Sequence, residues 1–193
     1  MSGLRIAVLV SGGGTNLQSV IDAVEAGVLQ SKIVCVISNK ETAYGLERAR
    51  AHHIPDYFIN PKEENYDERL FAKLQEEKVD LIVLAGYLKI LAPSLIQAYR
   101  NRIINIHPSL LPKFGGKGFY GLHVHKAVLA AGEKESGATV HFVNEGVDTG
   151  EIIIQRKVNI EPDDTPESLQ SRILEQIEHK ILVEAIKMLE GSN

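Results

Sequence analysis

The segment LRIAVLVSGGGTNLQSVIDAV, residues 4–24, predicts the fold class of this chain. Residues 4–10 form an almost uninterrupted apolar run, which is typical of a strand buried on both faces of a parallel sheet. Three glycines follow, and apolar residues then recur at helical spacing, at Leu17, Val20, Ile21 and Val24. The segment therefore predicts a strand, a glycine turn and a helix, which is the first half of a βαβ unit.

The rest of the chain repeats this alternation of strands and helices. Short apolar runs predict strands at 33–37, 56–59, 81–84 and 102–107, and helical patterns separate them at 43–51, at 66–77 and after Pro93. The β-branched stretches 137–143 and 151–158 predict two more strands. A long helix begins at 164–167, and its predicted apolar face contains Ile173, Ile177, Ile181, Ala185 and Met188.

These patterns predict one α/β domain over residues 1–193. We expect a doubly wound, mostly parallel, Rossmann-like sheet with an antiparallel C-terminal strand addition and a long C-terminal helix. The 193 residues suffice for one sizeable core, and 44% hydrophobic and 24% charged residues are an ordinary globular balance. A net charge of -4 argues against a general nucleic-acid surface.

The single cysteine, Cys35, excludes an intramolecular disulfide and suits a reducing compartment. Its place inside a strand predicts a small core residue and not a nucleophile. The chain contains no apolar run of membrane length and opens without a signal peptide. A cytoplasmic protein is therefore expected.

The glycine turn is a candidate phosphate site. Free backbone N–H groups at the start of a helix bind anions. The residues that would supply such groups here are Gly12, Gly13, Gly14, Thr15 and Asn16. Leu17 stands where a dinucleotide fingerprint has its third glycine, and no acidic residue follows the second strand at 38–40. These two departures argue against NAD. A turn that serves only close packing is the alternative.

Asn105 and His107 end the strand predicted at 102–107, just before Pro108. Residues separated by one position on a strand point to the same side, and ligands bind at the carboxyl ends of parallel strands. An amide and an imidazole are therefore expected together at a binding edge. The alternative is a buried histidine that serves only the local hydrogen bonding.

Two loops could complete a site. The stretch 85–91 places a glycine and apolar residues after a strand, as in a binding wall or a packing loop. The connection 144–150 contains Asp148, either as a functional carboxylate or as a turn residue. No nucleophile elbow surrounds Ser109, and neither a cysteine cluster nor an HExxH helix accompanies His123 and His125. We therefore expect neither a covalent intermediate nor a metal.

Four stretches together resemble the phosphoribosylglycinamide formyltransferases, within the folate-dependent formyltransferase family: 11–17, 84–91, 105–112 and 141–150. The resemblance covers nearly the whole chain. It implies a single formyltransferase domain that transfers the formyl group of 10-formyltetrahydrofolate, a co-substrate, directly to the amine of glycinamide ribonucleotide in purine biosynthesis. The expected partners are these two small molecules, with no nucleic acid and no membrane, for a monomer or homodimer.

The resemblance also implies roles for individual residues. It assigns catalysis to Asn105, His107 and Asp148, and it implies a cis peptide between Leu111 and Pro112. The ribonucleotide would contact Gly12, Gly13, Gly14, Thr15, Asn16, Leu17 and Glu178. The folate would contact Leu88, Lys89, Ile90, Leu91 and Asn105. The loop 115–121 is longer than the corresponding connection of some members, so its contacts do not follow from the family.

Residue chemistry suggests how the three catalytic candidates would act. Asn105 can donate to the developing oxyanion. His107 can be cationic near neutral pH, and it can then protonate the leaving nitrogen or stabilise the oxyanion. Asp148, if the fold places it beside His107, would raise the pKa of His107, and it could also hold a water that carries the proton. Two other functions remain open. A formyltetrahydrofolate hydrolase would use water in place of the amine, although such enzymes usually carry an N-terminal regulatory domain. A nucleotide-binding module would need the glycine turn but not Asn105, His107 and Asp148 together.

Overall fold

A seven-stranded sheet forms the centre of the computed structural model, which describes residues 3–191. The strand order is β3-β2-β1-β4-β5-β6-β7. The strands β1 to β5 pair in parallel, whereas β6 is antiparallel to both β5 and β7. The predicted sheet and its antiparallel addition are therefore confirmed. The strand bounds are β1 Arg5–Val10, β2 Lys32–Ser38, β3 Asp56–Phe58, β4 Leu81–Leu84, β5 Ile103–His107, β6 Glu135–Phe142 and β7 Ile152–Asn159.

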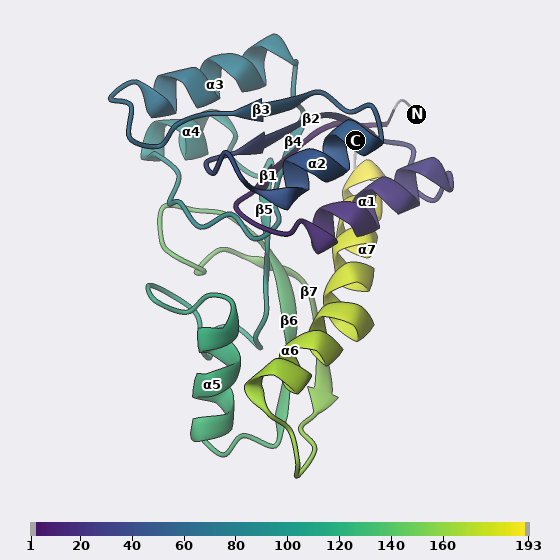
Figure 1. The fold of residues 1–193 in the computed structure, drawn as a ribbon, viewed down its shortest axis with the longest axis vertical. Coiled ribbons are helices and arrows are strands. Elements are labelled where there is room, and N and C mark those ends of the chain that lie inside the picture. The colour runs from purple at the N-terminus through teal and green to yellow at the C-terminus, as the bar shows by residue number, and fades with distance from the viewer. Residues whose placement is uncertain (1–2, 192–193) are drawn as a thin grey trace.

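Helices cover both faces of the sheet (Figure 1). One apolar cluster packs α1, α2 and α7 against the sheet, and a second cluster packs α3 and α4 against the opposite face. The helix bounds are α1 Thr15–Glu25, α2 Tyr44–Ala51, α3 Tyr66–Glu76, α4 Pro93–Ala98, α5 Leu122–Ala130, α6 Pro166–Ile173 and α7 His179–Glu190, with a π-helical turn, η1, at Leu174–Glu178.

The central strand β1 shows why its sequence is a continuous apolar run. Ile6 and Val8 face the cluster with α1 and α7, whereas Ala7 and Leu9 face the cluster with α3 and α4. Both sides are fully buried because side chains alternate along a strand between two helical layers. Cys35 on β2 is also buried, and burial raises the pKa of its thiol to about 12, as expected of a core residue.

The C-terminal helix differs from the uninterrupted helix predicted. Thr165 caps α6 through a capping box with Ser168, and η1 then interrupts the α-helical geometry before α7. Met188 is 53% exposed, so its predicted place on the apolar face is wrong. The other four predicted positions, Ile173, Ile177, Ile181 and Ala185, are buried before, within and after η1, so their part of the predicted face is confirmed. The buried face of α7 is formed by Ile181, Leu182, Ala185 and Ile186, and Met188 lies to one side of it.

The strand order reverses between β1 and β4, so these neighbours lead to opposite halves of the sheet. A crevice forms at such a reversal, outside the carboxyl ends of the strands. The glycine turn follows β1, the loop 85–91 follows β4, and β5 adjoins β4. The fold therefore directs three of the predicted binding segments to one edge.

Candidate active site

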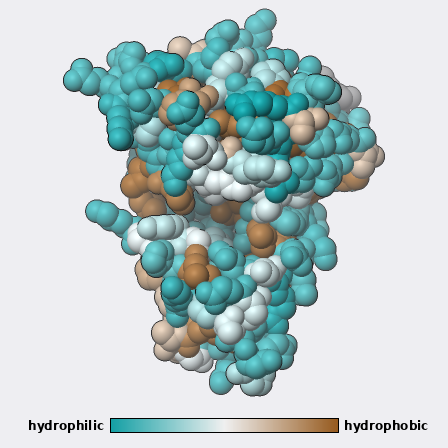
Figure 2. Space-filling model, in the orientation of Figure 1, coloured by the Kyte–Doolittle hydropathy of each residue, from teal (hydrophilic) through white to brown (hydrophobic). Residues whose placement is uncertain are grey.

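A cavity of about 560 Å³ lies at this edge of the sheet. Figure 2 shows the molecule hollowed at mid-height, with apolar residues beside the opening. Most of the site residues predicted from the sequence line the cavity, namely Asn16, Leu88, Lys89, Ile90, Leu91, Asn105, His107, Asp148 and Glu178. The remaining ones, Gly12, Gly13, Gly14, Thr15 and Leu17, lie outside the lining, on and just after the adjoining turn.

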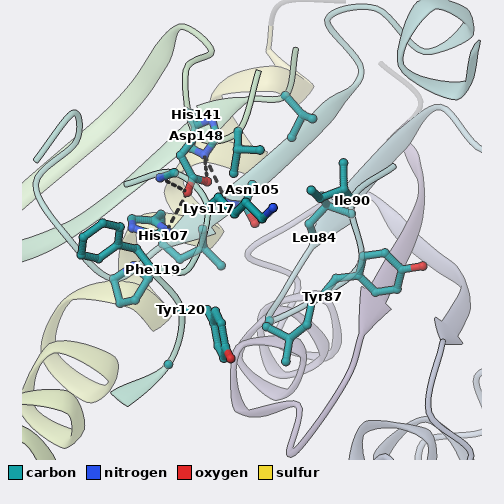
Figure 3. A pocket seen from close by; sticks show the side chains of 18 of the residues that line it. Leu84, Tyr87, Ile90, Asn105, His107, Lys117, Phe119, Tyr120, His141 and Asp148 are labelled. Carbon is teal, nitrogen blue, oxygen red and sulfur yellow. Dashed lines mark hydrogen bonds and ion pairs between the residues drawn. The ribbon is translucent and has the colours of Figure 1, made fainter. Parts of the chain in front are cut away.

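Asn105, His107 and Asp148 come together on one wall of the cavity (Figure 3). Asn105 and His107 lie at the end of β5 and point to the same side, as predicted. The Nδ1 atom of His107 lies 3.5 Å from Oδ2 of Asp148. The fold therefore joins a carboxylate and an imidazole that are far apart in the sequence.

Backbone geometry holds Asp148 in this position. Its φ of 56° lies in the left-handed region, which aspartate tolerates better than most residues. The N–H of Gly116 donates to Oδ2 at 3.0 Å. Burial raises the pKa of Asp148, but its contacts with His141, His107 and the Gly116 N–H lower it by more. The pKa consequently lies below its ordinary value, and the carboxyl group is ionised at neutral pH.

His107 is buried, and its ring has a fixed orientation. Nε2 donates to the carbonyl of Phe114 at 2.8 Å, which leaves Nδ1 to face Asp148. Burial lowers the pKa of His107, and this effect outweighs Asp148 and the Phe114 carbonyl, which both raise it. Asp148 thus raises the pKa of His107, as expected, but in the ligand-free protein burial disfavours the charge more than its partners favour it.

His141 on β6 is a member of this cluster that the sequence interpretation missed. It pairs with Asn105 in the β5–β6 ladder, and its Nε2 lies 3.2 Å from the Asn105 Nδ2 and 3.6 Å from Oδ1 of Asp148. Its Nδ1 donates to the carbonyl of Phe142 at 2.8 Å. In neutral His141 the Nε2 accepts from Asn105, which leaves the second N–H of that amide for a ligand. The signal that could have identified His141 from the sequence is a polar residue on the buried side of a predicted strand.

The glycine turn has one packed side and one open side. Gly14 has φ 71°, and a Cβ there would lie 2.8 Å from the Cα of Gly45. A Cβ at Gly12 or Gly13 would meet nothing within 4 Å. No side chain among residues 3–191 caps α1, so its first N–H groups stay available to an anion. Leu17 is fully buried, so only its backbone can contribute to this site.

Asn16 and Glu178 form a buried polar pair beside this turn. Nδ2 of Asn16 donates to Oε2 of Glu178 at 2.7 Å, and Oδ1 of Asn16 has no partner within the described chain. Glu178 is delivered by η1 and is 6% exposed. Burial raises its pKa to about 7, and the hydrogen bond from Asn16 lowers it only in part. An unsatisfied amide oxygen and a carboxylate suit a ligand with hydroxyl or amino donors.

The opposite wall of the cavity is apolar. Figure 3 shows Leu84 and Ile90 facing the polar cluster across the cavity. Leu88 and Ile90 are exposed, Leu91 is buried beneath them, and the Lys89 ammonium lies 4.7 Å from the centre of the Tyr66 ring. The loop 115–121, to which no contacts were assigned, contributes further lining residues that include Lys117, Phe119 and Tyr120.

Three other findings bear on the expectations from sequence. The Leu111–Pro112 peptide is cis, as predicted. His123 and His125 lie on α5, and no group of three or more His, Cys, Asp or Glu residues within 3–191 could hold a metal ion. Over the same residues, no helix combines the length and apolar character needed to cross a membrane.

Comparison with known proteins identifies the family. Residues 4–186 match the family model described as formyl transferase. The chain belongs to the formyl transferase family. This formyl transferase is 49% identical over 187 residues to a phosphoribosylglycinamide formyltransferase of Haemophilus influenzae, which covers 95% of this chain and 85% of that protein.

Solved structures agree with this assignment. The crystal structure of glycinamide ribonucleotide transformylase 1 from Symbiobacterium toebii has a TM-score of 0.92 and 42% identity, covering 99% of this chain and 89% of that chain. A formyltetrahydrofolate deformylase from Pseudomonas syringae has a TM-score of 0.85 and 30% identity, covering 95% of this chain and 60% of that chain. The higher identities favour a formyl transferase that acts on a ribonucleotide.

Proposed function

We infer that this chain is a phosphoribosylglycinamide formyltransferase of purine biosynthesis. It transfers the formyl group of 10-formyltetrahydrofolate to the amine of glycinamide ribonucleotide. One observation carries this function: an amide and a buried imidazole–carboxylate pair lie on one cavity wall, with a glycine turn and an uncapped helix start near one end and an apolar wall opposite. A family of formyl transferases supplies the reaction class.

The two substrates would occupy different parts of the cavity. The phosphate would lie on the open side of the turn at Gly12 and Gly13, where free N–H groups favour an anion. Asn16 and Glu178, which are close by, would accept from donors of the ribonucleotide. The pterin would lie along 88–91, because flat heterocycles bind apolar walls whose backbone supplies polar contacts.

The transfer is a direct attack of the amine on the formyl carbon. Attack forms the new C–N bond and an oxyanion, to which the free N–H of Asn105 would donate. Collapse breaks the bond to the folate nitrogen, which needs a proton, and the attacking nitrogen must lose one. His107 and Asp148 would move this proton as a pair, because Nδ1 of His107 faces the carboxylate and its other nitrogen is occupied. No acyl-enzyme is formed in this route.

The decisive experiment measures the release of tetrahydrofolate and of formate from 10-formyltetrahydrofolate, with and without glycinamide ribonucleotide. A transferase releases tetrahydrofolate only when the ribonucleotide is present. A hydrolase would release formate without it, and a binding module would show no turnover. His107→Asn should lower kcat by about 10²–10⁴-fold, the usual effect of removing a positioned proton-transfer group.

His53→Asn is the matched control for that variant. His53 is exposed and does not line the cavity, so this variant makes the same chemical change away from the site. Its positive φ is one that asparagine tolerates. Activity should be unchanged in this control. Equal activity of His107→Asn and His53→Asn would contradict the catalytic role given to the His107–Asp148 pair.

We further propose that the enzyme works in the cytoplasm. The buried thiol Cys35 suits a reducing compartment. A monomer or a homodimer remains the prediction for the assembly, and sedimentation of the purified protein would distinguish the two.

A further inference from the structure

The hydroxyl of Ser11 joins the segments that follow three neighbouring strands. Ser11 lies directly after β1 and immediately before the glycine turn, and it is 4% exposed. Its Oγ donates to Oδ1 of Asn39, which follows β2, at 2.6 Å. The same Oγ accepts from the N–H of Leu88, which follows β4, at 2.9 Å. One buried hydroxyl therefore contacts both neighbours of the central strand.

The backbone of Ser11 strengthens this connection. Its N–H donates to the carbonyl of Gly86 at 3.1 Å, so both the backbone and the side chain of Ser11 contact the loop after β4. On its other side, the turn is bonded to α2. The carbonyl of Gly12 accepts from Gly45, and that of Gly13 accepts from Arg48. The open side of the turn is thus the part that remains for a ligand.

These contacts connect two binding segments through one residue. The turn after Ser11 is the proposed phosphate site, and Leu88 begins the proposed folate wall. We propose that Ser11 is a positioning residue that couples the ribonucleotide site to the folate site. The proposal rests on the assignment of these two sites under the proposed function.

The coupling has a simple physical origin. A ligand on the turn restrains Ser11, and the restrained hydroxyl then fixes the Leu88 N–H at the start of the wall. The second ligand meets a segment that is already ordered, so it loses less conformational entropy on binding. Because binding linkage is reciprocal, each ligand must strengthen the other by the same factor.

The test measures that factor directly. Titration calorimetry gives the Kd of 5,8-dideazafolate, which carries no formyl group, with and without saturating glycinamide ribonucleotide, and then the reverse pair. In the wild type we expect each ligand to tighten the other by at least about 5-fold, the lower end of usual coupling. In Ser11→Ala the factor should fall to below about 2-fold.

Ser31→Ala is the matched control. Ser31 is also buried and its Oγ also accepts a backbone N–H, that of Leu4 at 3.0 Å, but it lies before β2, at the opposite end of the sheet. This variant should lose comparable stability and keep the wild-type coupling factor. A general loosening of the fold would lower the factor in both variants and would overturn the proposal.

The remaining outcomes are also informative. An unchanged factor in Ser11→Ala, or a wild-type factor near 1, would refute the coupling while leaving the proposed function intact. A wild type that binds neither ligand would refute the proposed function itself. If Ser11→Ala does not fold, Asn39→Ala replaces it, because that change removes the acceptor that orients the Ser11 hydroxyl. It should also lower the factor, and an unchanged factor would reject the proposal.

Discussion

Replacing Glu178 by glutamine should remove a large part of the pH dependence of folding. Glu178 is 6% exposed, and burial raises its pKa from 4.5 to about 7 in the folded protein. A group with a raised pKa favours the folded state fully below its unfolded pKa, and this contribution is lost as the pH rises through the folded pKa. The ligand-free enzyme should therefore lose stability between about pH 4.5 and pH 7.

The size of this effect follows from the two pKa values. The difference between 4.5 and about 7 corresponds to about 3 kcal/mol in the free energy of unfolding. Glutamine is neutral at every pH, and its carbonyl can still accept the hydrogen bond from Asn16. Glu178→Gln should thus match the wild type below about pH 4 and exceed its stability by about 3 kcal/mol above pH 8.

Urea unfolding of the ligand-free protein at pH 4 and at pH 8.5 measures this difference. Glu175→Gln is the control, because Glu175 lies on the same π turn but is exposed. It should keep the wild-type pH dependence. At pH 8.5, where Glu178 is charged, Glu178→Gln should bind glycinamide ribonucleotide about 10-fold more weakly than the wild type, since a hydrogen bond to a charged group is stronger than one to an amide. An unchanged pH dependence in Glu178→Gln would refute the reasoning.

Three further substitutions test the site. Asp148→Asn removes the charge beside His107, so kcat should fall by about 10²–10⁴-fold, and the limb of the kcat pH profile that is due to His107 should move to lower pH. A normal kcat with an unmoved limb would mean that Asp148 serves only as a turn residue. Gly13→Val, on the open side of the turn, should raise KM for the ribonucleotide far more than for the folate, and equal rises would argue against the phosphate placement. Ile90→Asp should weaken folate binding by roughly 1–3 kcal/mol in calorimetry; an unchanged affinity would place the pterin elsewhere.

Gly14→Val would not serve in place of Gly13→Val. The structure directs a Cβ at Gly14 toward the backbone of Gly45, and the residue has a positive φ. A side chain there would strain the contact between the turn and α2 before it reached a ligand. Gly14 therefore has the packing role that was the alternative interpretation of this turn, whereas Gly12 and Gly13 leave space for an anion.

Period-two patterns predicted much of the site. The alternation along 102–107 placed Asn105 and His107 on the same side, and the glycine turn was predicted by the strand before it and the helix after it. These features are local, because they depend on residues that are neighbours in the sequence. The spacing of Ile173, Ile177, Ile181 and Ala185 likewise predicted a buried helix face, although it did not predict the π-helical turn at Leu174–Glu178.

Contacts between distant segments could not be predicted in this way. His141 meets Asn105 only through the register of β5 with β6, which the sequence does not specify. The net direction of the His107 pKa shift could not be predicted either, because it depends on burial, and burial depends on the packing of all the surrounding elements. The resemblance to a family supplied Asp148, which local patterns could not distinguish from a turn residue.

The pair formed by His107 and Asp148 is oriented by the backbone of one short loop. The carbonyl of Phe114 accepts from Nε2 of His107, and the N–H of Gly116 donates to Oδ2 of Asp148. An acceptor beside an imidazole favours its cationic form, and a donor beside a carboxylate favours its anionic form. Both groups therefore favour the charge-separated pair, whereas burial of His107 favours its neutral ring. Residues 114–116 thus fix the orientation of the pair and offset part of the cost of a charged, buried His107 ring, which the proposed proton transfer would require.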